Sequence, residues 1–148
     1  MRKLLVLAAF ALAACGDGGG AQTHGLHVEN GWVTPTPGGV NMSAGYVTIV
    51  NDSDFADRLM SAASTRAANV SLHDMQMDGA VMRMRPSGPI AVPAHGRVSL
   101  APSGAHLMFN GVITPFTEGE QVRVQLTFEH AGAVSVELPV MRSAPEHH

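Results

Sequence analysis

The sequence is poor in cysteine, lysine and charge. It has one cysteine and one lysine in 148 residues, and charged residues make up 14%. Because Cys15 lies close to the start of the chain, a domain that follows it has no thiol for a disulfide framework or a thiolate metal site. The scarcity of lysine, with sixteen glycines and nine prolines, disfavours long helices and favours β structure.

Long apolar runs are also missing. The run from Leu4 to Leu12 is too short to cross a bilayer as a mature helix, but it is typical of a signal-peptide core. It ends in "LAAC", which resembles a bacterial lipobox. By this resemblance, Cys15 becomes the lipidated first residue of a periplasmic protein anchored to a bacterial membrane. The alternative is ordinary cleavage after Ala13, which would also export the chain but would leave Cys15 unmodified.

An excess of positive charge is absent as well. Removal of residues 1–14 takes away two of the nine basic residues and none of the twelve acidic residues, so the formal charge changes from −3 to −5. Such a chain offers no basic patch to a phosphate backbone, and nucleic acid is therefore excluded as a partner.

The residues that follow the N-terminal segment predict one β-rich domain. We expect a signal peptide over residues 1–14, a lipidated cysteine and flexible tether over 15–25, a β-sandwich over 26–141, and a short tail over 142–148. Eight or nine short β-type segments separated by Gly/Pro turn signals predict an all-β sandwich or barrel. In "QVRVQLTFE", the alternation places Val122, Val124, Leu126 and Phe128 on one face.

The segment "HDMQMDGAVMRMR" has the pattern of a β-hairpin. With Asp78 and Gly79 as the two central turn residues, Met75 faces Met82, His73 faces Met84, and Asp74 faces Arg83 as an exposed ion pair. One face of this ribbon then carries a histidine and four methionines: His73, Met75, Met77, Met82 and Met84. Two interpretations stay open for this face, because methionine fills cores as well as it binds soft metals.

A second histidine–methionine pair favours the metal interpretation. His106 and Met108 are two residues apart on an expected strand, so both side chains point to the same side. Imidazole and thioether donors together form a soft, neutral set that suits Cu(I) and disfavours Mg, Ca and Mn. Zinc would be expected to recruit cysteine or carboxylate ligands, and none is placed with these histidines and methionines.

The spacing of these residues resembles a known family. His73, ten residues, Met84, twenty-one residues, and His106-Leu107-Met108 match the H-x10-M-x21-H-x-M signature of the periplasmic PCu(A)C-type copper chaperones. The resemblance extends from about Gly31 to Val140. It implies a cupredoxin-like Greek-key β-sandwich that holds Cu(I) through His73, Met84, His106 and Met108.

The resemblance also implies partners. Members of the family are associated with copper delivery to the CuA centre in subunit II of cytochrome c oxidase, alongside Sco-type proteins. A copper-buffering lipoprotein without an oxidase partner, or a structural or adhesive β-sandwich, are the alternatives. An enzyme is not expected, because the sequence has no G-x-S-x-G motif, no cysteine nucleophile in the domain and no paired carboxylates near the histidines.

Several histidines fall outside this signature. His95 and His130 lie in Gly-flanked segments and are expected to be exposed loop residues. A second, Cu(II)-binding site is left open for the histidines near the two ends: His24, His27, His147 and His148.

Overall fold

The computed structural model describes residues 25–146, which form ten β-strands. Their bounds are β1 (Leu26–Val33), β2 (Met42–Asn51), β3 (Asp57–Ala63), β4 (Ala67–Asp78), β5 (Val81–Pro86), β6 (Ile90–Val92), β7 (Gly96–Ser99), β8 (His106–Val112), β9 (Gln121–Phe128) and β10 (Gly132–Pro139). The predicted all-β class is confirmed. The predicted number of strands was too low, because the three-residue β6 lies in a Gly/Pro-rich stretch and yet pairs with β3.

The strands form one curled antiparallel sheet in the order β1-β2-β8-β4-β3-β9-β10. A parallel bridge between Val33 and Val140 joins the two outer strands, so the sheet is a nearly closed barrel. The non-sequential order places β8 between β2 and β4. Strands far apart in the chain therefore supply neighbouring positions on one surface.

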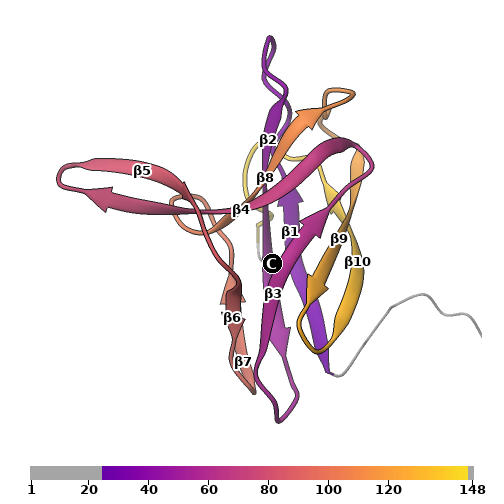
Figure 1. Ribbon diagram of the computed structural model, residues 1–148. Helices are drawn as coiled ribbons and strands as arrows, with labels where there is room; N and C mark the ends of the chain where they lie inside the picture. Colours follow the sequence, from indigo (N-terminus) through magenta and orange to yellow (C-terminus); the bar gives the residue numbers. More distant parts are fainter. Residues whose placement is uncertain (1–24, 147–148) are drawn as a thin grey trace, which may run out of the picture.

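Three short strands lie off this path. β6 pairs with β3 and β7 pairs with β2, whereas β5 pairs only with β4. β4 is the longest strand: its first half pairs with β8, and its second half leaves the barrel with β5. Figure 1 shows this two-stranded extension, residues 74–86, projecting from the side of the barrel. We call it the Met arm.

The barrel interior is built from the inward faces of these strands. β9 follows the predicted alternation, since Val122, Val124 and Leu126 are fully buried and Phe128 is 2% exposed. The largest fully buried side chains include Phe109, Phe116, Ile49 and Leu107. Within residues 25–146, no helix has the length and apolar character needed to cross a bilayer. The predicted signal peptide, Cys15, His24, His147 and His148 lie outside the described residues.

Candidate metal centre

β8 separates the core from the face that carries the predicted ligands. Leu107 and Phe109 are fully buried in the core, so the alternate residues His106 and Met108 project from the opposite face. Both are nevertheless well covered, with 5% and 7% of their surface exposed. This part of the strand is thus buried on both faces, and the shared side of His106 and Met108 follows from the strand alternation.

The two signature histidines lie directly opposite each other. His73 on β4 is the register partner of His106 on β8. Their ring centroids are 5.9 Å apart and the rings are tilted by 50°. Two imidazoles thus stand side by side on the face that points away from the core, and Ser71 occupies the position beside Met108.

The hydrogen bonds of the two rings differ. His106 Nδ1 lies 2.9 Å from the carbonyl oxygen of Gly104. A carbonyl only accepts, so Nδ1 carries the proton and Nε2 keeps its lone pair. His73 Nε2 lies 3.0 Å from Ser71 Oγ, which also accepts a hydrogen bond from Asn110 Nδ2 at 3.0 Å. The other ring nitrogen, His73 Nδ1, is buried and has no hydrogen-bond partner.

The environment of His73 favours the neutral form of its ring. Burial lowers the pKa of His73 below the ordinary value of 6.5, and the neighbouring His106 lowers it further. A neutral imidazole is the form that binds a metal ion. The lowered pKa of His73 therefore favours the form of the ring that can bind a metal ion.

Aromatic rings extend this face across β2 and β1. Tyr46 lies beside His106, with ring centroids 6.3 Å apart. The ring centroids of Trp32 and Tyr46 are 4.7 Å apart. Burial raises the pKa of the Tyr46 phenol. We call this surface the histidine face: Trp32, Tyr46, Ser71, His73, His106 and Met108.

Sequence reasoning missed four residues that support this face: Tyr46, Ser71, Gly104 and Asn110. A signal existed for Ser71 and Asn110, which lie two residues from His73 and Met108 on the same strands and so share their sides. The others come from the strand order and from a loop conformation, which local spacing does not encode.

The predicted register of the Met arm is wrong by two positions. Met75 faces Met84, Met77 faces Met82, and His73 faces Pro86. The turn residues are Gly79 and Ala80, with Gly79 at φ 66°. This is the glycine-first arrangement of a type II′ turn, not the Asp-Gly arrangement of a type I′ turn. Because the shift is even, the histidine and all four methionines stay on one face of the ribbon.

The corrected register changes two further predictions. Asp74 faces Arg85, while the Arg83 guanidinium lies 3.3 Å from Asp78, so the predicted Asp74–Arg83 ion pair is wrong. The interpretation of the methionine stripe as core is also wrong for three of the four arm methionines. Met77, Met82 and Met84 are 64%, 45% and 46% exposed.

The four signature residues thus have unequal settings. His73, His106 and Met108 are gathered on the sheet, whereas Met84 lies on the exposed arm, diagonal to His73 across β4 and β5. Diagonal neighbours in a sheet are about 7–8 Å apart, within reach of a long side chain. Among residues 25–146, no three His, Cys, Asp or Glu side chains form a group that could hold a metal ion. A metal on this face would need thioether ligands.

The other described histidines have partners of their own. The side chains of His95 and His130 are 62% and 67% exposed, as predicted, and His95 Nε2 lies 2.6 Å from Asp54. His27 lies on β1 with its Nε2 3.1 Å from Glu29. None of these three contacts the histidine face in the described hydrogen bonds and ring contacts.

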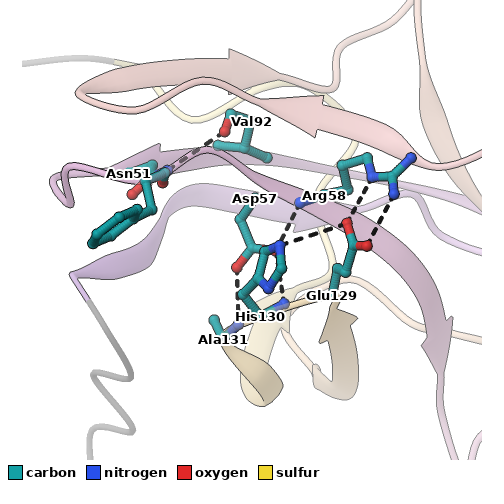
Figure 2. Close-up of polar contacts among 8 residues, drawn as sticks. Asn51, Asp57, Arg58, Val92, Glu129, His130 and Ala131 are labelled. Atoms are coloured by element: carbon teal, nitrogen blue, oxygen red, sulfur yellow. Dashed lines mark hydrogen bonds and ion pairs between the residues drawn. The ribbon is translucent and has the colours of Figure 1, made fainter.

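A second polar cluster lies where the β2–β3 and β9–β10 connections meet, beside a pocket of about 730 Å³. Figure 2 shows this turn cluster: Asn51, Asp57, Arg58, Glu129, His130 and Ala131. Asp57 is 6% exposed and accepts the backbone N–H groups of Arg58, His130 and Ala131 at 2.7, 2.9 and 2.8 Å. Since its oxygens are occupied by backbone donors, Asp57 has a structural role.

Comparison with known proteins matches most of the described chain. The family model described as "Putative lipoprotein LpqE-like" covers residues 26–140. The protein "Putative lipoprotein Lxx21020" of Leifsonia xyli subsp. xyli (strain CTCB07) is 28% identical over 122 residues, which are 82% of this chain and 72% of the relative.

Two solved structures extend the match to the fold. The copper-bound PCuAC domain from PmoF2 is 26% identical with a TM-score of 0.68, over 83% of this chain and 96% of that one. The Cu(I) form of DR1885 from Deinococcus radiodurans is 29% identical with a TM-score of 0.58, over 83% of each chain. The chain therefore belongs to the LpqE-like family and to the PCu(A)C-type copper chaperone family.

Proposed function

We propose that this chain is an exported copper chaperone that binds one Cu(I) through His73, Met84, His106 and Met108. The observation that carries the proposal is the buried Nδ1 of His73, which has no partner and lies on a ring directly opposite His106. An unpartnered buried polar atom costs roughly 1–3 kcal/mol, and a bound cation would remove that cost.

The donor set supports Cu(I) over other ions. When His73 donates its Nε2 proton to Ser71 Oγ, the Nδ1 lone pair is free, as is the Nε2 lone pair of His106. Met108 contributes a thioether from the same face and Met84 contributes one from the arm. Two imidazoles and two thioethers carry no charge and suit a soft monovalent ion, whereas harder ions prefer carboxylate oxygens.

An anaerobic titration tests the site. The mature chain with Cys15→Ser, which removes the only thiol, is titrated with Cu(I) against a colorimetric chelator. We expect one tight equivalent, and X-ray absorption at that equivalent should show two sulfur and two nitrogen donors. A spectrum with only nitrogen and oxygen donors would refute the assignment. Cu(II) should bind more weakly, because thioethers are poor ligands for the harder ion.

Delivery to a partner is favoured over storage by the position of Met84. This ligand is 46% exposed on a projecting arm, so a receiving protein could contact it without opening the barrel. We propose that the recipient is the CuA centre in subunit II of cytochrome c oxidase, with Sco-type proteins acting in the same process. A buffering lipoprotein is the second candidate.

A transfer assay separates the two. The Cu(I)-loaded chain is mixed with the purified apo CuA domain, and the copper content of each protein is measured after separation. Transfer faster than release of Cu(I) to a dilute chelator indicates a dedicated donor. Equal rates indicate a buffer.

The membrane anchor is a separate proposal. The family and the Leifsonia relative are both named as lipoproteins, and the sequence "LAAC" ends at Cys15. We expect lipidation of Cys15 after removal of residues 1–14. Inhibition of the lipoprotein signal peptidase should then leave an unprocessed precursor, whereas a mature soluble protein without Cys15 would contradict the proposal.

A further inference from the structure

The outer half of the Met arm exposes methionines that the four-ligand site does not use. Met77 and Met82 are 64% and 45% exposed, and Val81 beside the turn is 54% exposed. Large apolar side chains grouped on a projecting hairpin are costly for solubility, and such groups commonly mark a binding function. The two opposed side chains, Met77 and Met82, are both thioethers, and their chemistry favours binding of a soft metal ion.

The register makes Met77 and Met82 a pair. They are direct cross-strand partners next to the Gly79–Ala80 turn, and opposed Cβ atoms are about 5 Å apart. Methionine has a long, unbranched and flexible side chain, so the two sulfur atoms can approach one ion. The next pair inward is Met75 and Met84, two residues or about 7 Å along the strands.

The charges of the arm are kept off this face. Arg83 and Arg85 alternate with the methionines and so point to the other side of the ribbon. Both guanidinium groups lie near Asp78, at 3.3 and 3.9 Å, and this carboxylate offsets part of their repulsion of a cation. The methionine face therefore presents neutral soft donors to an approaching ion.

We propose that Met77 and Met82 form a second, weaker Cu(I) site at the tip of the Met arm, from which the ion passes by way of the Met75–Met84 pair to the histidine face. This proposal rests on the proposed function. The passage exchanges neutral thioether ligands for one another and then for imidazole. Copper remains Cu(I), no electron moves, and no proton is released by a thioether.

The test follows each methionine separately. The mature chain with Cys15→Ser, labelled with ¹³C at the methionine methyl groups, is titrated anaerobically with Cu(I) and observed by NMR. We expect the Met84 and Met108 signals to shift during the first equivalent. The Met77 and Met82 signals should then shift together during the second.

Two comparisons make the result specific. Met60 on β3 is 41% exposed and has no methionine partner in the described register, so its signal should not move. The double variant Met77→Leu/Met82→Leu should lose the second equivalent, retain the first, and load more slowly from a Cu(I)–chelator complex.

Several outcomes overturn the proposal. Unmoved Met77 and Met82 signals through two equivalents would leave the tip as an apolar contact surface only. Equal shifts at Met60 would indicate non-specific thioether binding. Shifts of Met77 and Met82 within the first equivalent would place them in the primary site. Failure of the proposed function has a different signature, in which the Met84 and Met108 signals do not move.

Discussion

The turn cluster and the histidine face are both polar arrangements on the same barrel, but only one is complete. In the turn cluster, Asp57 accepts three backbone N–H groups, and Arg58 donates two hydrogen bonds to Glu129. On the histidine face, the buried Nδ1 of His73 has no partner. A satisfied cluster contributes to stability, whereas a buried atom left without a partner is available to a ligand.

The strongest test of this comparison replaces His73. In His73→Leu, an apolar side chain of similar size takes the place of the unpartnered ring. We expect the affinity for the first Cu(I) to fall by more than about 100-fold. Loss of a residue that only hydrogen-bonds to a metal ligand already lowers metal affinity roughly 10–100-fold. The free energy of unfolding of the apo protein should change little, because the loss of the Nε2 contact with Ser71 Oγ is offset by removal of the unpartnered Nδ1. A large loss of stability with unchanged affinity would make His73 structural.

The opposite pattern is expected in the turn cluster. Asp57→Asn replaces one acceptor oxygen by an amide N–H₂ group that faces a backbone donor. The free energy of unfolding should fall by roughly 1–3 kcal/mol, the cost of leaving a buried donor unsatisfied. Urea denaturation measures the change, and the Cu(I) affinity of the folded variant should equal that of the parent chain.

The same carboxylate predicts an acid-dependent stability. Burial opposes the ionised form of Asp57, but the backbone donors of His130, Arg58 and Ala131 outweigh it and lower its pKa below the ordinary 3.8. The unfolded state therefore binds the proton first. The stability that Asp57 contributes is present above about pH 3.8 and is lost as the pH falls through the lower folded-state pKa. Asp57→Asn should flatten this part of the stability–pH curve.

Two opposed methionines of the Met arm differ in their expected contribution to the first Cu(I) site. Met75 and Met84 are direct partners, yet only Met84 belongs to the family signature. Leucine keeps the apolar volume of methionine and removes the sulfur donor. We expect Met84→Leu to weaken the first Cu(I) equivalent by about tenfold or more, close to 1.4 kcal/mol, and Met75→Leu to weaken it far less. Competition against a Cu(I) chelator measures both, and equal losses would show that the arm ligand is misassigned.

The sequence predicted the local parts of this structure and missed the non-local ones. The alternation of β9 was readable because each strand buries one face, and it correctly placed Val122 and Phe128 in the core. The common faces of His106 and Met108, and of the arm methionines, follow from the same two-residue period. The direct pairing of His73 with His106 does not, because it depends on β8 inserting between β2 and β4.

The error at the hairpin has a local cause. Asp78-Gly79 is a strong signal for a two-residue turn, but glycine can occupy either central position with positive φ. In the structure Gly79 takes the first and Ala80 the second. The register therefore moved by two residues, which changed every partner and left every face unchanged. Predictions of which residues share a face are therefore unaffected, whereas the predicted Asp74–Arg83 ion pair is wrong.

The smallest expected effect concerns how much each of the two thioether ligands contributes to the stability of the apo protein. Met108 is 7% exposed and packed on the sheet, whereas Met84 is 46% exposed on the arm. Met108→Leu should lower the free energy of unfolding of the apo protein by less than about 1.5 kcal/mol, as volume-conserving core swaps do. Met84→Leu should change it by no more than about 0.5 kcal/mol, as at other exposed positions. Denaturant unfolding of the two variants measures this difference. A larger loss at Met84 than at Met108 would mean that Met84 anchors the arm by packing. Met84 would then not be an exposed ligand that a partner protein can reach.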